Sequence, residues 1–265
     1  MTITLPNDSV RLVESGDRVE VWIDRPDTRN AISRDVLAAL HAILDDVEES
    51  PRFLIVTGGT DGVFASGADL RDLARRRAAE ALTAPNVALY ERLSRAPLPT
   101  VAAIDGYALG GGAELAMACD LRVTTARAVF GQPESSLGLL AGAGGTFRLR
   151  ALVGDSLARQ ILFLGRRLDG AQAVAAGLAD ALVEEPGELM TAANAMVDTM
   201  ARSTPISLRL AKLAMRVPAA AHPEFDMVAQ GLLYEEGQAH DRIRAFLDRK
   251  PRSSAPTSTT PPTTS

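Results

Sequence analysis

The sequence predicts an α/β fold built around a parallel sheet, and two stretches carry this prediction. An amphipathic helical pattern over residues 33–49 is followed by Phe-Leu-Ile-Val-Thr at 53–57, an apolar run that suits a strand buried on both faces. Farther on, the apolar run 101–104 leads into Gly-Gly-Gly at 110–112 and then into good helix formers, which indicates a strand, a glycine turn and a helix. Strands that alternate with helices are typical of βαβ units.

The first half of the chain begins with a predicted β-hairpin. Residues 10–13 and 19–24 alternate apolar with polar side chains around Ser-Gly-Asp at 15–17. Ser33 is a suitable N-cap for the helix that follows, and the apolar positions of this helix recur at helical spacing up to Glu49. The order of these elements places the helix between two strands.

A charged stretch at 71–80 follows a turn of small residues at 63–70. Four arginines cluster in it: Arg71, Arg75, Arg76 and Arg77. A run of this kind is typical of a solvated helix face. Another helix is expected to close near residue 95, before the strand at 101–104.

The second half changes from alternating elements to consecutive helices. We expect strands at 121–124 and 181–183, and helices at 157–164, 169–176, 189–201, from Pro205 to before Pro218, and at 225–247 as one long helix. This change places a boundary near residue 202, which predicts a core over 1–201 that carries the active site and a helical region over 202–250. Residues 251–265 are almost wholly Pro, Ser and Thr, which predicts a disordered tail.

The composition is that of a globular protein. Of the 265 residues, 46% are hydrophobic and 23% are charged, and the net charge is −5, which argues against nucleic acid or an anionic membrane as the main partner. No apolar run reaches the length of a membrane span, and the first residues lack the pattern of a secretory signal. We therefore expect a soluble, cytoplasmic protein.

The side chains that usually bind metals are few. Cys119 is the single cysteine, and its apolar neighbours indicate a buried thiol. His41, His222 and His240 are scattered without metal-ligand spacing, and no Gly-x-Ser-x-Gly motif is present. The sequence therefore predicts neither a metal site nor Ser-His catalysis.

The glycine turn at 110–112 suggests chemistry at an oxygen atom. A turn that opens a helix leaves backbone N–H groups unpaired, and these suit an oxygen that develops negative charge. Glu114 lies beside them in the first helical turn. The alternative is structural, because glycines let a helix start close to a strand and a Glu there interacts favourably with the helix dipole. Leu115 argues against a dinucleotide fingerprint, and no Gly-Lys-Ser/Thr is present for a P-loop.

A second carboxylate, Glu134, follows Pro133 in a region expected to be a loop. The rigid proline restricts the backbone just before Glu134, so the carboxylate is expected to be held in place. The alternative is an ordinary solvated acidic residue.

Six motifs in order give the chain a specific resemblance. They are Arg-Pro-Asp-Thr-Arg-Asn-Ala at 25–31, Phe-Ala-Ser-Gly-Ala-Asp-Leu at 64–70, Gly-Tyr-Ala-Leu-Gly-Gly-Gly-Ala-Glu-Leu-Ala at 106–116, Phe-Gly-Gln-Pro-Glu at 130–134, Gly-Ala-Gly-Gly-Thr at 142–146 and Arg-Ala-Phe-Leu-Asp-Arg at 244–249. Over residues 8–252 the chain resembles the crotonase, or enoyl-CoA hydratase/isomerase, superfamily.

This resemblance implies a fold and a ligand. The fold is a spiral of ββα turns that builds two roughly perpendicular sheets, followed by a C-terminal helical trimerisation region. The assembly is a homotrimer or a dimer of trimers. The ligand is an acyl-CoA thioester, whose CoA is part of the substrate, so no separate cofactor is implied.

The resemblance also implies residue roles. The backbone N–H groups of Ala68 and Gly111 would bind the thioester oxygen, and Glu114 and Glu134 match the two glutamates of the hydratases. Glu114 would orient and deprotonate water, and Glu134 would protonate the α-carbon. The implied reaction is the addition of water to a 2-trans-enoyl-CoA to give a 3-hydroxyacyl-CoA.

Further positions are implied for CoA. They are the backbone of 65–70, with Ala65, Ala68, Asp69 and Leu70, then Gly111, and the cations Arg29, Arg71 and, from a neighbouring subunit, Lys250. Ala141 and Phe147 depart from the residues frequent in the family, which leaves the chain-length preference open. Other readings are an isomerase or another acyl-CoA enzyme of this fold, or a protein that binds acyl-CoA without turnover.

Overall fold

The computed structural model describes residues 3–248. Lys250 and the predicted tail at 251–265 lie outside the described residues. The described chain falls into two compact units, 3–212 and 213–248. The first unit holds both sheets and every residue of the site described below.

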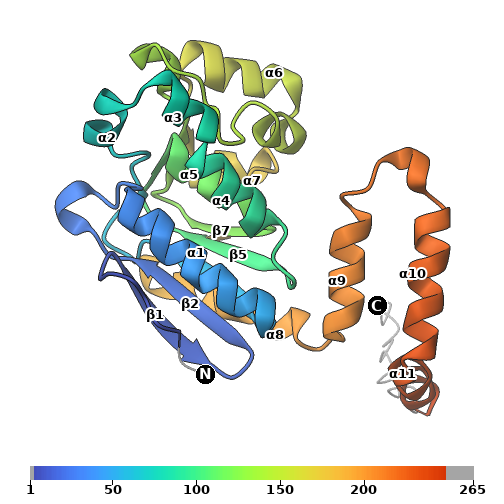
Figure 1. The fold of residues 1–265 in the computed structure, drawn as a ribbon. Coiled ribbons are helices and arrows are strands. Elements are labelled where there is room, and N and C mark those ends of the chain that lie inside the picture. The colour runs from blue at the N-terminus through green and yellow to red at the C-terminus, as the bar shows by residue number, and fades with distance from the viewer. Residues whose placement is uncertain (1–2, 249–265) are drawn as a thin grey trace, which may run out of the picture. The chain divides into compact units, whose positions relative to one another are not determined.

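Six strands form the larger sheet of the first unit (Figure 1). In spatial order they are β1 (Val10–Ser15), β2 (Arg18–Ile23), β3 (Phe53–Thr57), β5 (Thr100–Ile104), β7 (Leu121–Thr125) and β10 (Ala181–Val183). The opening hairpin β1–β2 is antiparallel, and all later neighbours pair in parallel. The predicted hairpin and parallel sheet are confirmed.

Four short strands form a second sheet, and along the chain they alternate with strands of the first sheet. It consists of β4 (Val63–Ala65), β6 (Tyr107–Leu109), β8 (Val129–Gly131) and β9 (Leu168–Asp169). Each of β4, β6 and β8 follows a strand of the larger sheet after a few residues, which gives the expected ββα repeat and confirms two sheets. The residues at 63–65, expected as part of a turn, are a strand. Strands of two or three residues are too short to show an alternating pattern.

The helices cover these sheets. Their bounds are α1 (Arg34–Glu49), α2 (Leu70–Arg75), α3 (Ala78–Thr83), α4 (Pro85–Ser94), α5 (Gly111–Ala118), α6 (Arg148–Leu164), α7 (Gly170–Ala175), α8 (Leu189–Met200), α9 (Pro205–Ala214), α10 (Glu224–Glu235) and α11 (Gln238–Leu247). Short 3-10 turns occur at η1 (Pro26–Thr28), η2 (Glu134–Leu137), η3 (Pro186–Glu188) and η4 (Ala219–Ala221). No helix within residues 3–248 is long and apolar enough to cross a membrane.

Helix α1 forms as its sequence predicts. The Ser33 hydroxyl accepts a hydrogen bond from the N–H of Val36, which caps the helix. Its apolar face, from Val36 to Val47, is buried against the core of the first unit. Helix α1 packs against α4, and α4 packs against α5, so the helices near the glycine turn rest on a continuous core (Figure 1).

Two predicted helices differ from the structure. The helix predicted at 157–164 is the second half of α6, which starts at Arg148, and Gly154 with φ of 75° places a kink between the two halves. The predicted long helix 225–247 is wrong. It is two helices, because Gly237 adopts a left-handed conformation with φ of 74° between α10 and α11.

The second unit contains η4, α10 and α11. None of the residues of these helices is buried within the described chain. Their exposed apolar side chains include Met227, Val228, Leu232, Ile243 and Phe246. The amphipathic faces of this unit therefore lack a covering layer within residues 3–248.

Candidate active site

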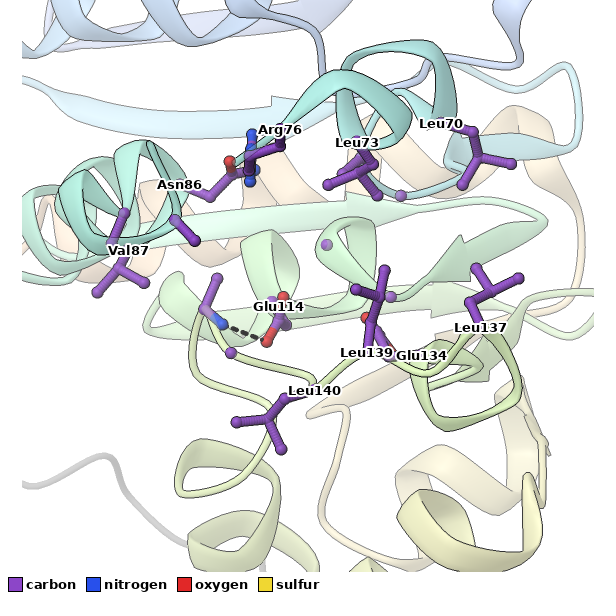
Figure 2. A pocket seen from close by; sticks show the side chains of 18 of the residues that line it. Leu70, Leu73, Arg76, Asn86, Val87, Glu114, Glu134, Leu137, Leu139 and Leu140 are labelled. Carbon is purple, nitrogen blue, oxygen red and sulfur yellow. Dashed lines mark hydrogen bonds between the residues drawn. The ribbon is translucent and has the colours of Figure 1, made fainter. Parts of the chain in front are cut away.

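A cavity of about 320 Å³ lies in the first unit, and its volume is in the range of small-molecule sites. In Figure 2, side chains of residues 70–87 form one wall, and side chains of residues 134–140 form the other. Glu114 lies between the two walls. The lining is mostly apolar, and its charged side chains are Arg76, Glu114 and Glu134.

Ala68 and Gly111 meet at the edge of this cavity. Both residues line it, and a Cβ atom added to Gly111 would lie 3.3 Å from the nitrogen of Ala68. Among residues 3–248, neither the N–H of Ala68 nor that of Gly111 donates a hydrogen bond. Gly111 is the first residue of α5, where N–H groups have no partner within the helix. The structure therefore brings two free backbone donors together, as the sequence implied.

Two neighbouring positions favour glycine. A Cβ atom at Gly112 would lie 2.2 Å from the carbonyl oxygen of Ala65 in β4, so a side chain there would push α5 off the second sheet. Gly110 has φ of 51°, and a Cβ atom there would lie 2.7 Å from Oε1 of Glu134. The absence of a side chain at 110 lets the Glu134 carboxyl group lie against the glycine turn.

Tyr90 of α4 anchors the turn from behind. Its hydroxyl donates to the carbonyl oxygen of Gly111 at 2.8 Å, and its side chain is fully buried. Burial raises the pKa of the Tyr90 hydroxyl, so it stays protonated and continues to donate. The bond therefore fixes the peptide plane between Gly111 and Gly112, which directly follows the N–H of Gly111.

Glu114 projects from α5 into the cavity and is 3% exposed. Its Oε1 accepts hydrogen bonds from the N–H groups of Ala143 at 2.7 Å and Gly145 at 2.9 Å. Burial raises the pKa of Glu114 above its ordinary value. The donors from Gly145 and Ala143 and the charge of Arg148 oppose part of this rise. Two donors on one oxygen leave Oε2 as the oxygen that can exchange protons.

Arg148, at the start of α6, holds the turn that supplies these donors. Its Nη1 donates to the carbonyl oxygen of Ala143 at 3.1 Å, and its Nη2 pairs with the Glu91 carboxylate of α4. The Arg148 side chain is 12% exposed. The ion pair therefore connects the second glycine-rich turn to the helix that carries Tyr90.

Glu134 begins η2, directly after Pro133, and lines the opposite side of the cavity. Burial raises its pKa to about 7, and the negative charge of Glu114 adds to this rise. With its amide nitrogen turned toward Glu134, the buried Gln132 donates to Oε2 at 3.0 Å and to Oε1 at 3.1 Å. A carboxyl group with a pKa near 7 is partly protonated at neutral pH, so it can donate a proton.

The two carboxyl groups thus occupy different environments within one cavity. Glu114 accepts two backbone donors, whereas Glu134 has a pKa of about 7. Such a pair can divide the work of an acid and a base. The free N–H groups of Ala68 and Gly111 can bind an oxygen that becomes negatively charged beside them.

The other residues implied for CoA differ in burial and in whether they line the cavity. Leu70 lines the cavity, whereas Ala65 is buried in β4 below it. The Asp69 side chain accepts from the N–H of Arg71 and caps α2. Arg29 and Arg71 are exposed and do not line the cavity. Lys250 lies outside the described residues.

Four residues were missed by sequence reasoning: Tyr90, Gln132, Ala143 and Arg148. Gln132 lies inside the motif 130–134, so its position two residues before Glu134 was the signal that could have found it. The turn at 142–146 was recognised as a motif, but its contact with Glu114 spans about thirty residues and leaves no local pattern. Tyr90 and Arg148 lie in helices, where the spacing of apolar residues predicts which positions are buried but not which partners their polar groups bind.

Three other positions complete the description. Ala141 is buried beneath the turn, and a Cβ atom at Gly145 would lie 2.7 Å from its side chain. Phe147 is 55% exposed, and the Arg148 guanidinium lies 4.8 Å from the centre of its ring. Cys119 is buried, which raises its thiol pKa to about 12.

Within residues 3–248, no three His, Cys, Asp or Glu side chains lie together as metal ligands.

The chain is similar to proteins of known family. A family profile described as enoyl-CoA hydratase/isomerase matches residues 17–251. The bovine "enoyl-CoA hydratase domain-containing protein 2, mitochondrial" is 39% identical over 87% of this chain and 82% of its own length. The "short-chain-enoyl-CoA hydratase" of Clostridium acetobutylicum is 32% identical over 92% of this chain and 96% of its own.

A solved structure supports the same assignment. The subunit I structure titled as an enoyl-CoA hydratase from Geobacillus kaustophilus HTA426 superposes with a TM-score of 0.85 at 33% identity, over 93% of this chain and 98% of that one. The sequence match and the two-sheet architecture support the same family. The chain therefore belongs to the enoyl-CoA hydratase/isomerase family and has the crotonase fold.

Proposed function

We propose that this protein is an enoyl-CoA hydratase, which adds water across the double bond of a 2-trans-enoyl-CoA to give a 3-hydroxyacyl-CoA. The observation that carries the proposal is the pair Glu114 and Glu134, which face one cavity beside two unpaired backbone N–H groups. Relatives named as enoyl-CoA hydratases support it. The acyl-CoA is the substrate, and no separate cofactor is proposed.

The N–H groups of Ala68 and Gly111 bind the thioester oxygen in this proposal. Addition of a nucleophile at the β-carbon moves negative charge onto that oxygen, as in an enolate. Fixed donors stabilise such charge without reorganising solvent, and the loss of one donor costs about 3 to 4 kcal/mol of barrier. The bond from Tyr90 to the carbonyl of Gly111 supports this role, because it anchors the peptide that directly follows this N–H group.

The carboxyl groups move the protons. Glu114 accepts a proton from the attacking water, whose oxygen bonds to the β-carbon. Glu134, with a pKa of about 7, donates its proton to the α-carbon. Proton exchange between the carboxyl groups and solvent then restores the starting protonation states. The different environments of the two groups support this division of roles.

An absorbance assay tests the proposal. A panel of 2-trans-enoyl-CoA esters of different chain lengths is incubated with the protein, and loss of the conjugated enoyl thioester chromophore is followed. We expect hydration, identified by the 3-hydroxyacyl-CoA product in mass spectrometry. A gain of that chromophore from 3-enoyl-CoA with no hydration would identify an isomerase instead. Tight acyl-CoA binding with neither reaction would identify a binding protein.

The assembly is also a proposal. We propose a homotrimer or a dimer of trimers, supported by the exposed apolar side chains of α10 and α11, such as Leu232 and Phe246. Light scattering that gives the mass of one chain at micromolar concentration would contradict this. The cytoplasmic location stays a prediction, because relatives named as mitochondrial are among those that the chain matches.

A further inference from the structure

Arg76 occupies a different place from the other arginines of its cluster. It lies between α2 and α3, is partly buried and lines the cavity that holds Glu114 and Glu134. Arg71, Arg75 and Arg77 are exposed and do not line it. Figure 2 shows Arg76 on the same wall as Leu73 and Asn86. The sequence grouped these four arginines as one solvated face, and the structure separates them.

The guanidinium of Arg76 is unpaired within residues 3–248: it forms no hydrogen bond, ion pair or contact over an aromatic ring. The other partly or fully buried arginines of the described chain each form an ion pair with a carboxylate. They are Arg18, Arg25, Arg52, Arg92, Arg122 and Arg148. Arg76 is therefore the exception in a chain that otherwise pairs such groups.

An unpaired guanidinium at the wall of an apolar cavity attracts an anion. Its planar fork fits a carboxylate or phosphate through two parallel hydrogen bonds, and water that is displaced from the cavity no longer screens the charge. The neighbouring lining of Leu73, Ala81 and Val87 is apolar, and Asn86 is the uncharged polar side chain on the same wall. An anionic group of a bound ligand would therefore satisfy Arg76.

An acyl-CoA carries two possible sources of anionic oxygen. Its CoA phosphates are one source, and a carboxylate at the far end of the acyl chain is the other. The cations that the family resemblance assigns to the phosphates, Arg29 and Arg71, are exposed and lie outside the cavity wall. Arg76 instead lines the same cavity as the two glutamates, where the reacting end of the ligand is expected.

We propose that Arg76 binds a carboxylate at the end of the acyl chain, so that the preferred substrate is a dicarboxylic 2-enoyl-CoA. This inference rests on the proposed hydratase function, because it names the substrate class of that site. A second negative charge on the acyl chain is unfavourable near Glu114 and Glu134 unless a cation holds it. Arg76 is that cation.

Binding of unreactive thioesters tests the proposal without any turnover. Pentanoyl-CoA and 4-carboxybutanoyl-CoA have acyl chains of the same length, and only the second ends in a carboxylate. Their dissociation constants are measured by titration calorimetry for the wild type, Arg76→Gln, Arg76→Lys and Arg75→Gln. Arg75 is the matched control, because it is 77% exposed and lies 3.6 Å from Asp72.

We expect the wild type to bind 4-carboxybutanoyl-CoA more tightly than pentanoyl-CoA. Arg76→Gln should lower this preference by about 10-fold to 100-fold, the usual effect of losing a hydrogen bond to a charged group. Arg76→Lys should keep part of the preference, and Arg75→Gln should leave it unchanged. A wild type without preference would overturn the proposal. Equal weakening of both ligands in Arg76→Gln would also overturn it and would assign Arg76 to a CoA phosphate.

The two proposals fail in different ways. Hydration is measured in parallel with the 2-enoyl forms of the same two thioesters. If the carboxylate preference holds but neither ester is hydrated, the hydratase proposal fails and the Arg76 assignment stands. If both esters are hydrated and the preference is absent, the Arg76 assignment fails and the hydratase proposal stands.

Discussion

The N–H of Gly145 donates to Oε1 of Glu114 at 2.9 Å, which ties the second glycine-rich turn to the helix that starts at the first. The same oxygen also accepts from Ala143, so the Glu114 carboxylate has a fixed orientation in the cavity. Glu134 has no such backbone donors from that turn and keeps a pKa of about 7. Differences in reactivity between the two glutamates should follow from this asymmetry.

Each glutamate should be required for hydration. Glu114→Gln and Glu134→Gln should each lower kcat for crotonyl-CoA by about two to four orders of magnitude, the usual range for loss of an acid or base. The loss of activity in the double variant should be much smaller than the two single losses combined, because both groups serve one step. Binding of butanoyl-CoA should persist, since backbone N–H groups hold the thioester. A Glu134→Gln variant with near wild-type kcat would contradict the two-carboxylate mechanism.

The pH dependence of kcat/KM should be bell-shaped. Glu134 must be protonated to act as an acid, and its pKa is about 7, so the rate should fall as pH rises through about 7. Glu114 must be ionised to act as a base, and its pKa is raised, so the acidic limb should lie above the ordinary value of 4.5. Because the groups interact, the two limbs report apparent values of the pair. An alkaline limb that persists in Glu114→Gln and Glu134→Gln alike would assign it to another group.

Stability should respond to the Glu134 charge. Its folded pKa is raised from 4.5 to about 7, so the folded state binds more protons than the unfolded state in this window. The stabilisation that the folded state gains by binding this proton is therefore complete below about pH 4.5, and it is lost as the pH rises through about 7. The Tm of Glu134→Gln minus that of the wild type should increase over this window and level off above it. A difference that stays flat from pH 4.5 to 7 would show that the pKa of Glu134 is ordinary.

Arg148 should act as a positioning residue for Glu114. Arg148→Met removes the bond to Ala143 and the charge that lowers the pKa of Glu114. We expect kcat to fall by up to about 100-fold, the effect of a small misplacement, and the acidic limb to move to higher pH. Arg148→Lys should keep part of the wild-type kcat and should move the acidic limb less than Arg148→Met does.

The control for Arg148 is on the same helix. Arg150→Met removes an exposed side chain that pairs with Asp155, so kcat and the acidic limb should stay as in the wild type. A fall in Tm for Arg148→Met with an unchanged pH profile would reduce its role to stability alone.

Gly110→Ala should displace the carboxyl group of Glu134. The added Cβ atom would lie 2.7 Å from Oε1, and the end of a Glu side chain can move away. We expect a fall in kcat of up to about 100-fold with butanoyl-CoA still bound. Gly165→Ala is the matched control, because Gly165 also has a positive φ, of 67°, and its Cβ atom would meet nothing within 4 Å. Hydration by Gly110→Ala at the wild-type rate would show that the position of Glu134 against this turn is unimportant.

The sequence by itself determined the larger sheet and its first helix. Strands β3 and β5 are continuous apolar runs, and α1 has an eligible N-cap with apolar residues at helical spacing, so local pattern was enough. The resemblance to the family also implied that Glu114, Glu134, Ala68 and Gly111 lie together, because each lies inside one of the six motifs.

Tertiary structure decided what has no local pattern. The strands of the second sheet have two or three residues, and only their pairing identifies them. The break between α10 and α11 falls at Gly237, whereas Gly231 lies inside α10, because only Gly237 of the two adopts a positive φ. Likewise, the four arginines at 71 and 75–77 look alike in the sequence, yet Arg76 alone among them lines the cavity. The direction of a side chain depends on the backbone turn between α2 and α3, and composition does not record it.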